Sequence, residues 1–554
     1  MIKALKLLTL ACILSATAFA QKAVKKTTPN GWHLEDLATT GYNGISIEKA
    51  YAFLRSTNRK SNQIIVAVID SGIDTLHEDL KPILWRNPKE IPGNNKDDDK
   101  NGFIDDVNGW NFIGGKDGRN VKEDSYEAAR VYHKLKAKWE GKTGENLTGK
   151  EKKEFDDYTR AKAKTVEGVN TAEIEQLKMM LPKFKAGDEV IRRDLGKTTY
   201  DGNALRTYSS ANNDAMFVKQ MVMGISQANN SYEITNEQLL EQLDGEIRKA
   251  EAADTPPENF RDNIVQDDPT NINDRYYGNN DIMANTPFHG THCAGIIAAV
   301  RNNNKGVNGV ADNVRIMMIR AVPDGDEHDK DIANAIRYAV DNGARVISMS
   351  FGKDFSPQKM WVDDAFKYAA AKGVLLVHAA GNDAKDIDVK ENFPSTVFED
   401  GTRATNVITV GAAGDEKNGG LTASFSNYGK KEVDVFAPGV AIYSTIPGGD
   451  TYGNSSGTSM ACPAVAGVAA LLLQYYPTLT PTQLKMAIEK SAQKPKYMVT
   501  NPSTKQTVDL SELSVSGGMV NAYEAAKYAS TIGEVKQQPR KKLPKTTIKK
   551  TRRG

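Results

Sequence analysis

The sequence predicts an α/β fold in which a doubly wound, mostly parallel β-sheet is interrupted by a large α-helical insertion. Short runs of apolar and mainly β-branched residues are typical of parallel strands that are covered on both faces. Amphipathic helical patterns lie between these runs, so strand and helix alternate along the chain. A long stretch without such runs follows the first expected strand. The expected strands are residues 64–69, 314–319, 346–349, 374–377 and 407–410.

The first twenty residues are expected to be a secretory signal peptide. Lys3 and Lys6 precede an apolar run over residues 7–16, and Ala18-Phe19-Ala20 then has the small-x-small pattern of a cleavage site. Residues 1–20 would direct export to the periplasm or the extracellular medium and would be removed by cleavage before Gln21.

The rest of the chain is expected to have no transmembrane segment, because no later run approaches the ~20 apolar residues that span a membrane. A lipid anchor on Cys12 is the alternative to cleavage, but Thr9 stands where such sites carry leucine. The 72 basic and 70 acidic side chains give a formal net charge of +2, so no nucleic-acid partner is expected. The 554 residues exceed a single core of ~250–300 residues. The sequence gives no indication of the oligomeric state.

Residues 116–263 are expected to form the α-helical insertion, because they lack β-rich runs and mix charges of both signs. Thr148 with Glu151 and Thr235 with Gln238 have the spacing of capping boxes. We interpret the insertion as a helical lid or prop, with a separate binding activity as the alternative. Helical spacing links Val131, Leu135 and Trp139, then Ile174, Leu177 and Leu181, then Leu240, Leu243 and Ile247.

The flanking residues 21–115 and 264–530 would form the two parts of one α/β domain. In the second part, Thr480-Pro481-Thr482-Gln483 supplies an N-cap, a first-turn proline and a capping-box glutamine. Residues 531–554 gather lysine and arginine among proline and threonine and cannot bury a core, so a disordered basic tail is expected. Adhesion of this tail to an anionic surface is the alternative.

Three short segments each place one reactive side chain among glycines and other small residues. The segments are Val68-Ile69-Asp70-Ser71-Gly72-Ile73-Asp74, His289-Gly290-Thr291-His292-Cys293-Ala294-Gly295 and Gly457-Thr458-Ser459-Met460-Ala461-Cys462-Pro463. In this chain order they resemble the catalytic blocks of the subtilisin family of serine proteases (peptidase S8, subtilases), whereas chymotrypsin-like enzymes and α/β-hydrolases use other orders. The resemblance covers residues 30–115 and 265–530.

The resemblance implies a catalytic triad of Asp70, His289 and Ser459. A serine hydroxyl is a poor nucleophile unless a base lies within hydrogen-bond reach. His289 would take the Ser459 proton and return it to the leaving amine, while Asp70 would hold the other ring nitrogen. The segment Ala379-Ala380-Gly381-Asn382 resembles the family's oxyanion segment. Asn382 would therefore donate from its side-chain amide, beside the backbone N–H of Ser459.

The resemblance also implies where the substrate binds. One segment after the strand at 346–349 resembles the family segment whose backbone pairs with an extended polypeptide substrate. A second segment, before Asn382, would complete the pocket for the residue that precedes the cut. No charged side chain is evident there, which predicts a broad or apolar-leaning preference. The predicted substrate-binding residues are Ser350, Phe351, Gly352, Ala379, Ala380 and Gly381.

The cysteines and the second histidine of the His289 block are expected to be structural. Cys293 and Cys462 each lie in a catalytic block, and a disulfide between them is the alternative to two buried thiols. His292 forms a His-x-x-His pattern with His289, but the pattern lacks the glutamate of zinc metalloproteases.

Calcium is the possible cofactor, in a structural role. The run from Asp97 to Asp106 alternates oxygen ligands around a glycine, as calcium requires, and a solvated acidic turn is the alternative. Asp79 matches a family calcium ligand, and the loop over 301–304 resembles its partner with one extra residue, so either Asn302 or Asn303 could serve. The predicted ligands are Asp79, Asn302, Asp97, Asp99, Asn101 and Asp105.

The sequence therefore predicts an exported serine endopeptidase. One alternative is a processing protease with a single dedicated substrate selected by the helical insertion. The other is an inactive binding protein that keeps the subtilisin fold.

Overall fold

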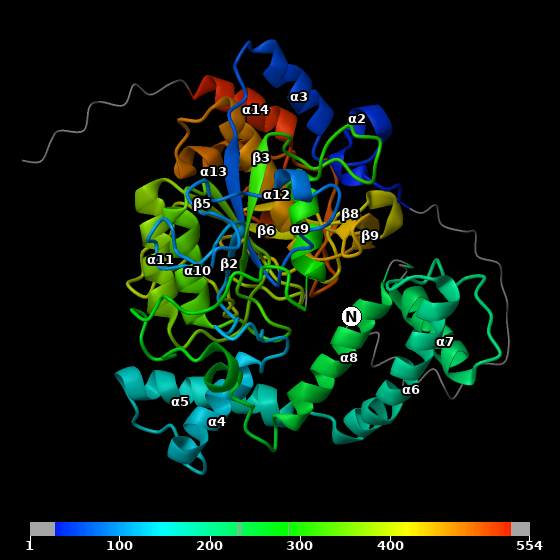
Figure 1. Cartoon of the computed structure of the whole chain (residues 1–554), viewed down its shortest axis with the longest axis vertical. Helices are drawn as coiled ribbons and strands as arrows, with labels where there is room; N and C mark the ends of the chain where they lie inside the picture. Colours follow the sequence, from blue (N-terminus) through cyan, green and yellow to red (C-terminus); the bar gives the residue numbers. More distant parts are fainter. Residues whose placement is uncertain (1–27, 230–231, 233, 286, 533–554) are drawn as a thin grey trace, which may run out of the picture.

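The computed structural model describes residues 28–229, 232, 234–285 and 287–532 (Figure 1). The predicted signal peptide over 1–20 and residues 533–554 of the predicted tail lie outside the described residues. The tail boundary predicted at residue 531 is corrected, because Thr531 is the last residue of a helix.

A seven-stranded sheet forms the centre of the molecule, in the order β2-β3-β1-β4-β5-β6-β7. All neighbouring strands in it run parallel, which confirms the predicted α/β class. Each of the five expected strands is present, and the short β2 and β7 were not predicted. The strands are β1 (Ile64–Asp70), β2 (Gly109–Asn111), β3 (Val314–Arg320), β4 (Val346–Met349), β5 (Leu375–Ala379), β6 (Val407–Ala413) and β7 (Val435–Pro438).

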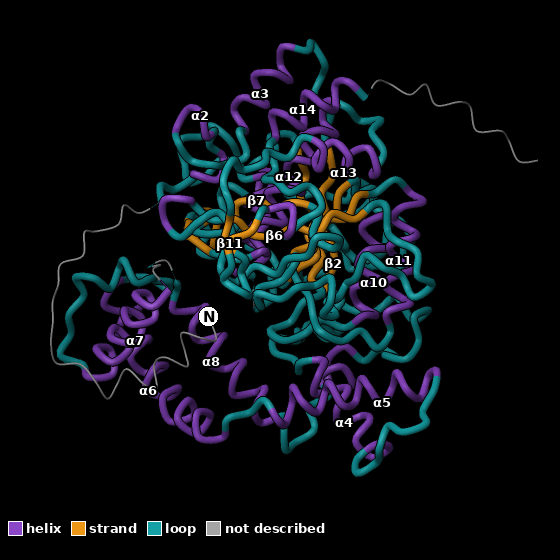
Figure 2. Tube along the Cα trace, turned by 180° about the vertical axis from the view of Figure 1, so that it is seen from behind, coloured by secondary structure: helices purple, strands orange, loops and turns teal. Residues whose placement is uncertain are grey.

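Helices cover both faces of this sheet (Figure 2). Along β1, Val66 and Val68 pack into the layer formed by α9 and α12, whereas Ala67 and Ile69 pack into the layer formed by α10 and α11. Alternate residues thus meet different layers, which is why the run is continuously apolar. The helices of the body are α2 (Leu37–Thr40), α3 (Ile47–Ser56), α9 (Phe288–Ala298), α10 (Asp329–Asp341), α11 (Lys359–Lys372), α12 (Thr458–Tyr475), α13 (Pro481–Lys490) and α14 (Ala522–Thr531).

Two small antiparallel sheets and six short helical turns complete the elements. β8 (Ile442–Ile446) pairs with β9 (Thr451–Ser455), and β10 (Val499–Thr500) pairs with β11 (Thr507–Val508). The turns are η1 (Trp32–Leu34), η2 (Lys81–Ile83), η3 (Ala163–Glu167), η4 (Arg261–Val265), η5 (Glu416–Asn418) and η6 (Leu510–Glu512).

Five helices lie between the Asp70 and His289 blocks, and they form two separate apolar groups. Side chains of α4 and α5 surround Phe355, which belongs to the α/β body. The apolar core of α6, α7 and α8, which we call the helical lobe, contains only residues between 174 and 247 among those described. In both views the lobe stands beside the sheet-bearing body (Figures 1 and 2). The helices are α4 (Glu127–Trp139), α5 (Gly149–Lys162), α6 (Thr171–Leu195), α7 (Asn213–Asn229) and α8 (Asn236–Glu251).

Two of the three predicted capping boxes are present. Thr235 with Gln238 and Thr480 with Gln483 make both reciprocal hydrogen bonds. The box predicted at Thr148 is wrong, because its side chain makes no cap hydrogen bond. The next residue, Gly149, has φ +55, and this left-handed first residue turns the N–H groups of α5 away from the Thr148 hydroxyl.

One helix among the described residues is long and apolar enough to cross a membrane, by length and composition. It is α12, which carries Ser459, and 94% of this helix is buried inside the protein. Its hydrophobicity is accounted for by its central place in the core.

Phe355→Ala is expected to loosen α4 and α5 without affecting the helical lobe. Phe355 is 3% exposed, and removal of a buried phenyl ring costs about 3–5 kcal/mol. Hydrogen exchange measured by mass spectrometry should show faster exchange in α4 and α5. The matched variant Phe184→Ala, in the lobe core, should speed up exchange in α6 to α8 instead. The same exchange pattern in both variants would contradict two separate apolar groups.

Candidate active site

The carboxyl end of β1 brings Asp70 to the centre of the sheet edge. β1 lies between β3 and β4. The next two strands in the chain, β2 and β3, lie on one side of β1, and the following strand, β4, lies on the other side. Such a switch point opens a crevice at the carboxyl ends of the strands. Asp70 is 2% exposed, and its Oδ1 accepts hydrogen bonds from Ser71 N and from His289 Nδ1, both at 2.7 Å.

A close approach between α9 and β1 makes the Asp70–His289 contact possible. A Cβ atom at Gly290 would lie 2.2 Å from Gly72 O and 3.1 Å from Asp70 Cβ. Gly72 itself has φ +132, which favours glycine. Larger residues at either position would push His289 away from Asp70.

Ser459 lies in the first turn of α12, close to the same edge. Its Oγ donates to Ser350 O at 3.3 Å, so the hydroxyl points toward the predicted substrate segment rather than toward His289. The backbone carbonyl of Ser459 accepts from Ser350 Oγ at 2.9 Å and from Cys293 Sγ at 3.4 Å. Cys293 Sγ also lies 3.9 Å from His289 Nδ1. The thiol therefore packs where α9 meets α12, between His289 and Ser459.

Both cysteines in the described part of the chain are free and buried. Cys462 Sγ donates to Val377 O at 3.2 Å, and burial raises its pKa to about 12. The disulfide alternative does not apply to this structure.

The Asn382 side chain is oriented by Thr458. Its Oδ1 accepts from Thr458 N and from Thr458 Oγ1, each at 2.9 Å. The amide Nδ2 consequently lies on the other side, 3.5 Å from the point where a Cβ of Gly457 would be. Asn382 is exposed, so this N–H group can reach a ligand beside Ser459.

A cavity of about 880 Å³ opens beside these residues. It is lined by Ser459, Thr458 and Asn382 and by five of the six predicted substrate-binding residues: Ser350, Phe351, Gly352, Ala379 and Gly381. Ala380 is the exception. It is buried in an apolar cluster, and its N–H donates to Val410 O, because alternate residues of the extended segment face opposite sides.

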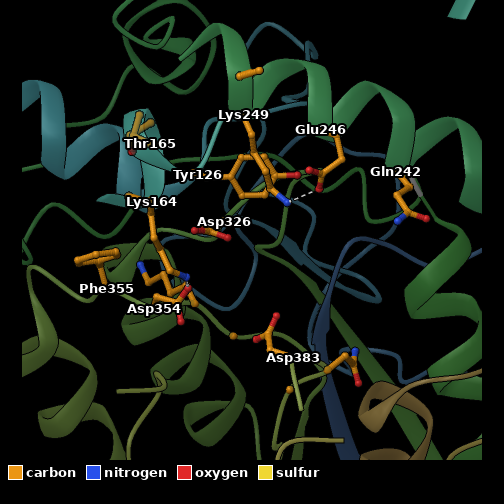
Figure 3. A pocket seen from close by; sticks show the side chains of 18 of the residues that line it. Tyr126, Lys164, Thr165, Gln242, Glu246, Lys249, Asp326, Asp354, Phe355 and Asp383 are labelled. Carbon is orange, nitrogen blue, oxygen red and sulfur yellow. Dashed lines mark hydrogen bonds and ion pairs between the residues drawn. The ribbon is translucent and has the colours of Figure 1, made fainter. Parts of the chain in front are cut away.

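Charged side chains line this cavity, contrary to the sequence-based expectation. Figure 3 shows Lys164, Glu246 and Lys249 reaching it from the inserted helices, and Asp354 and Asp383 from the body. Lys164 pairs with Asp354, which also pairs with Lys385 at 2.7 Å. Lys164, Glu246 and Lys249 belong to the insertion and precede the segment at Ser350 by more than a hundred residues. No local pattern could therefore place them in this cavity.

Electrostatics distinguishes the two histidines of α9. Burial opposes protonation of His289, but the adjacent Asp70 carboxylate raises its pKa well above the ordinary value. Burial lowers the pKa of His292 to about 3, and its Nε2 contacts Gly453 O at 3.2 Å. The two groups of potential metal ligands found among the described residues do not include His292.

Asp79 is a predicted calcium ligand, but both of its carboxylate oxygens already accept hydrogen bonds. The donors are Asn303 Nδ2 and the Tyr452 hydroxyl. The prediction that Asn302 joins Asp79 as a ligand is corrected. The Asn302 side chain is exposed, the φ of this residue is +59, and its backbone N–H donates to Asn308 Oδ1. The extra residue of the loop turns the neighbouring Asn303 toward Asp79 instead.

The acidic loop after η2 brings together a different ligand set from the predicted one. Asp97, Asp99 and Glu90 each place a carboxylate oxygen within 4.8 Å of the others. Glu90 is 5% exposed, and its Oε2 has no hydrogen-bond partner among the described residues. Glu90 was not among the predicted ligands, because it precedes the acidic run in the sequence.

The two other predicted ligands of this loop serve its own turns. Asp105 accepts from Gly93 N and Asn95 N. Asn101 Oδ1 accepts from Phe103 N at 2.8 Å. Neither side chain is in the group formed by Glu90, Asp97 and Asp99.

Comparison with known proteins gives consistent matches. A family model described as Peptidase_S8, "Subtilase family", matches residues 61–511. The "Thermophilic serine proteinase" of Bacillus sp. (strain AK1) is 46% identical over 207 residues, which is 37% of this chain and 47% of that protein. "Thermitase" of Thermoactinomyces vulgaris is 37% identical over 254 residues, which is 46% of this chain and 80% of thermitase. "Subtilisin DY" of Bacillus licheniformis is 40% identical over 208 residues, which is 37% and 70% of the two chains. The chain spans about half the length of the first of these relatives.

We expect the ring of His289 to titrate above the ordinary value of ~6.5 and Asp70→Asn to lower its pKa. The carboxylate stabilises the imidazolium, so removal of its charge should lower the pKa by about 1–3 pH units. NMR titration of the ring protons measures this directly. Asp74→Asn is a matched control, because Asp74 hydrogen-bonds Leu76, Gly448 and Gly449. An unchanged His289 pKa in Asp70→Asn would refute the assigned cause.

Proposed function

The chain belongs to the subtilase family, and from that we propose that it is an exported serine endopeptidase acting through Asp70, His289 and Ser459. The observation that carries the proposal is the 2.7 Å hydrogen bond from His289 to Asp70, beside the helix start that bears Ser459. The predicted signal peptide over residues 1–20 supports export to the periplasm or medium. We assign residues 21–115 and 264–530 to the protease domain and 116–263 to the insertion.

The reaction follows from the positions of these groups. Rotation of the Ser459 side chain away from Ser350 O would bring its hydroxyl to His289, whose neutral ring accepts the proton as Oγ attacks the substrate carbonyl carbon. The imidazolium then protonates the leaving amine, which leaves an acyl-enzyme on Ser459. Water hydrolyses this ester with His289 again acting as the base. Asp70 stabilises the imidazolium in both halves of the reaction.

The developing negative charge on the substrate oxygen would be stabilised by two donors. One is Asn382 Nδ2, whose orientation is set by the hydrogen bonds from Thr458 to Oδ1. The other is the backbone N–H of Ser459 in the first turn of α12. Because Thr458 already orients the Asn382 side chain, these donors would need little reorganisation during the reaction.

The substrate is a polypeptide that pairs with the segment from Ser350 to Gly352 in an extended conformation. Charges of both signs in the cavity favour a broad preference over an apolar one. The enclosure of the same cavity by inserted helices is the specific observation that favours the second candidate, a processing protease selective for its substrate.

A calcium ion with a structural role fits Glu90, Asp97 and Asp99. Calcium binds hard oxygen ligands, and the buried, unpartnered Glu90 Oε2 needs a cation or a donor to offset its desolvation. Asp79 fits less well, because Asn303 Nδ2 and the Tyr452 hydroxyl both donate to it. Asp99 also accepts from Asn87 Nδ2, but it lies beside the unpartnered Glu90 oxygen. The bound ion would neutralise the clustered carboxylates and hold the loop against β2.

Ser459→Ala should abolish peptide hydrolysis and labelling by a fluorophosphonate probe. Asn382→Ala should lower kcat by about 10²–10³, as loss of this donor does in a subtilisin, with a smaller effect on KM. In the parent protein kcat/KM should rise with pH through the His289 pKa, because only the neutral ring accepts a proton. Ser456→Ala is the control, since Ser456 Oγ accepts only a backbone hydrogen bond from Ala441. If Ser459 in the folded protein is not labelled, the chain is an inactive binding protein.

Chelation of calcium should lower the Tm, and Glu90→Gln should remove most of this dependence. A ligand present at 100 times its Kd contributes about 2.7 kcal/mol to stability. Thermal unfolding followed by circular dichroism, with excess calcium or with EGTA, measures the effect without reference to activity. Asp117→Asn, an exposed acid outside the cluster, should keep the full calcium dependence. An equal Tm under both conditions would rule out the site.

A further inference from the structure

Helix α8 has two different faces. Leu239, Leu243 and Ile247 pack into the core of the helical lobe. Gln242, Glu246, Lys249 and Ala250 line the cavity that also contains Ser459, and Figure 3 shows Gln242, Glu246 and Lys249 pointing from one helix toward it. The polar face of α8 therefore lies opposite the protease surface, with the cavity between them.

Both ends of α8 contact the protease body through polar groups. Near its start, Gln238 Nε2 donates to Ser455 Oγ at 2.9 Å, and Ser455 ends β9 four residues before Ser459. Near its end, Arg248 Nη2 lies 3.0 Å from Asp324 Oδ1 and donates to Asp324 O at 3.1 Å. Asp324 belongs to the loop that follows β3. Near the second of these contacts, the centroid of the Tyr126 ring lies 4.5 Å from Lys249 Nζ, and its hydroxyl lies 2.7 Å from the point where a Cβ of Gly245 would be. The helix is thus held by Gln238 near its start and by Arg248, together with Tyr126, toward its end.

The distance from Gln238 to the first contact further along the helix limits what can pass beneath it. Seven residues separate Gln238 from Gly245, where Tyr126 approaches the helix, which is about 10 Å along a helix. An extended chain needs only ~5 Å in the plane of a sheet and ~10 Å across it. A folded domain of 100 residues has a radius of gyration of about 13 Å, so it is too wide.

We propose that α8 is a roof over the substrate cleft, which admits extended polypeptide segments and excludes segments held at both ends by a folded domain. This inference rests on the proposed endopeptidase function and names its substrate class. In an extended chain, alternate side chains point to opposite faces. Those that face away from the protease pockets would point toward Gln242, Glu246 and Lys249.

The polar contacts at the ends of the roof make it separable from the catalytic groups. Arg248 is not among the cavity-lining residues, and among the described residues it forms ion pairs with Asp324 and Glu123. Reversal of its charge should release one end of α8 and leave the reacting groups in place.

The test compares one cleavable sequence in two forms: as a free linear peptide and as a surface loop closed at both ends by a stable globular domain. The parent enzyme should cleave the linear form efficiently and the closed loop far more slowly. Arg248→Glu should raise kcat/KM for the closed loop about tenfold, the effect of ~1.4 kcal/mol, and leave the linear peptide unchanged. The double variant Arg248→Glu/Asp324→Arg should restore exclusion of the loop. Arg193→Glu, an exposed site on the lobe, should behave as the parent.

Several results would overturn the roof. Equal cleavage of both forms by the parent enzyme would show that the cleft is open. An equal rise for both forms in Arg248→Glu would show that α8 must lift for every substrate. Failure of the double variant to restore exclusion would show that the charge pair is not the cause. If neither form is cleaved and Ser459 is not labelled, the proposed function itself fails, which is distinguishable from the loss of the roof alone.

Discussion

The arrangement around the cleft depends on one buried ammonium group, that of Lys353. It directly follows Gly352 and lies 2.8 Å from Glu127 Oε2 and 2.9 Å from Asp329 Oδ1, and it donates to Glu327 O at 2.8 Å. Burial alone would lower the pKa of Lys353, but the Asp329 and Glu127 carboxylates raise it above the ordinary value. Breaking such a pair costs about 3–5 kcal/mol. The substrate segment, the start of α4 and the start of α10 are therefore held together.

The inserted helices fall into two parts, which are attached to the protease body in different ways. Next to Lys353, Phe355 is buried among α4 and α5, so these helices share a core with the protease and move with it. The helical lobe has its own apolar core and meets the rim of the cleft through Gln238 and Arg248. The position of the lobe over the cleft is set by these polar contacts, whereas the residues proposed for catalysis are held by the core of the α/β body.

Local sequence patterns predicted the central sheet well, and the structure brings the predicted Asp70 and His289 within hydrogen-bond distance. Buried parallel strands need continuous apolar runs. A residue that comes soon after a parallel strand lies at the carboxyl edge of the sheet, as Asn382 does three residues after β5. The capping boxes at Thr235 and Thr480 depend on four consecutive residues. The box at Thr148 failed because of the left-handed Gly149, a conformation that the capping pattern does not record.

The amino-acid order alone was enough to identify the fold class and the family resemblance and to propose Asp70, His289, Ser459 and Asn382 as catalytic residues, because these inferences depend on short-range periodicity and on motifs a few residues long. It could not place Glu90 beside Asp97, turn Asn303 rather than Asn302 toward Asp79, or bury Ala380. Nor could it bring the charges of α8 over Ser459. These features come from the packing of segments that are distant in sequence, where the register of a loop or the position of a helix is set by contacts and not by neighbouring residues.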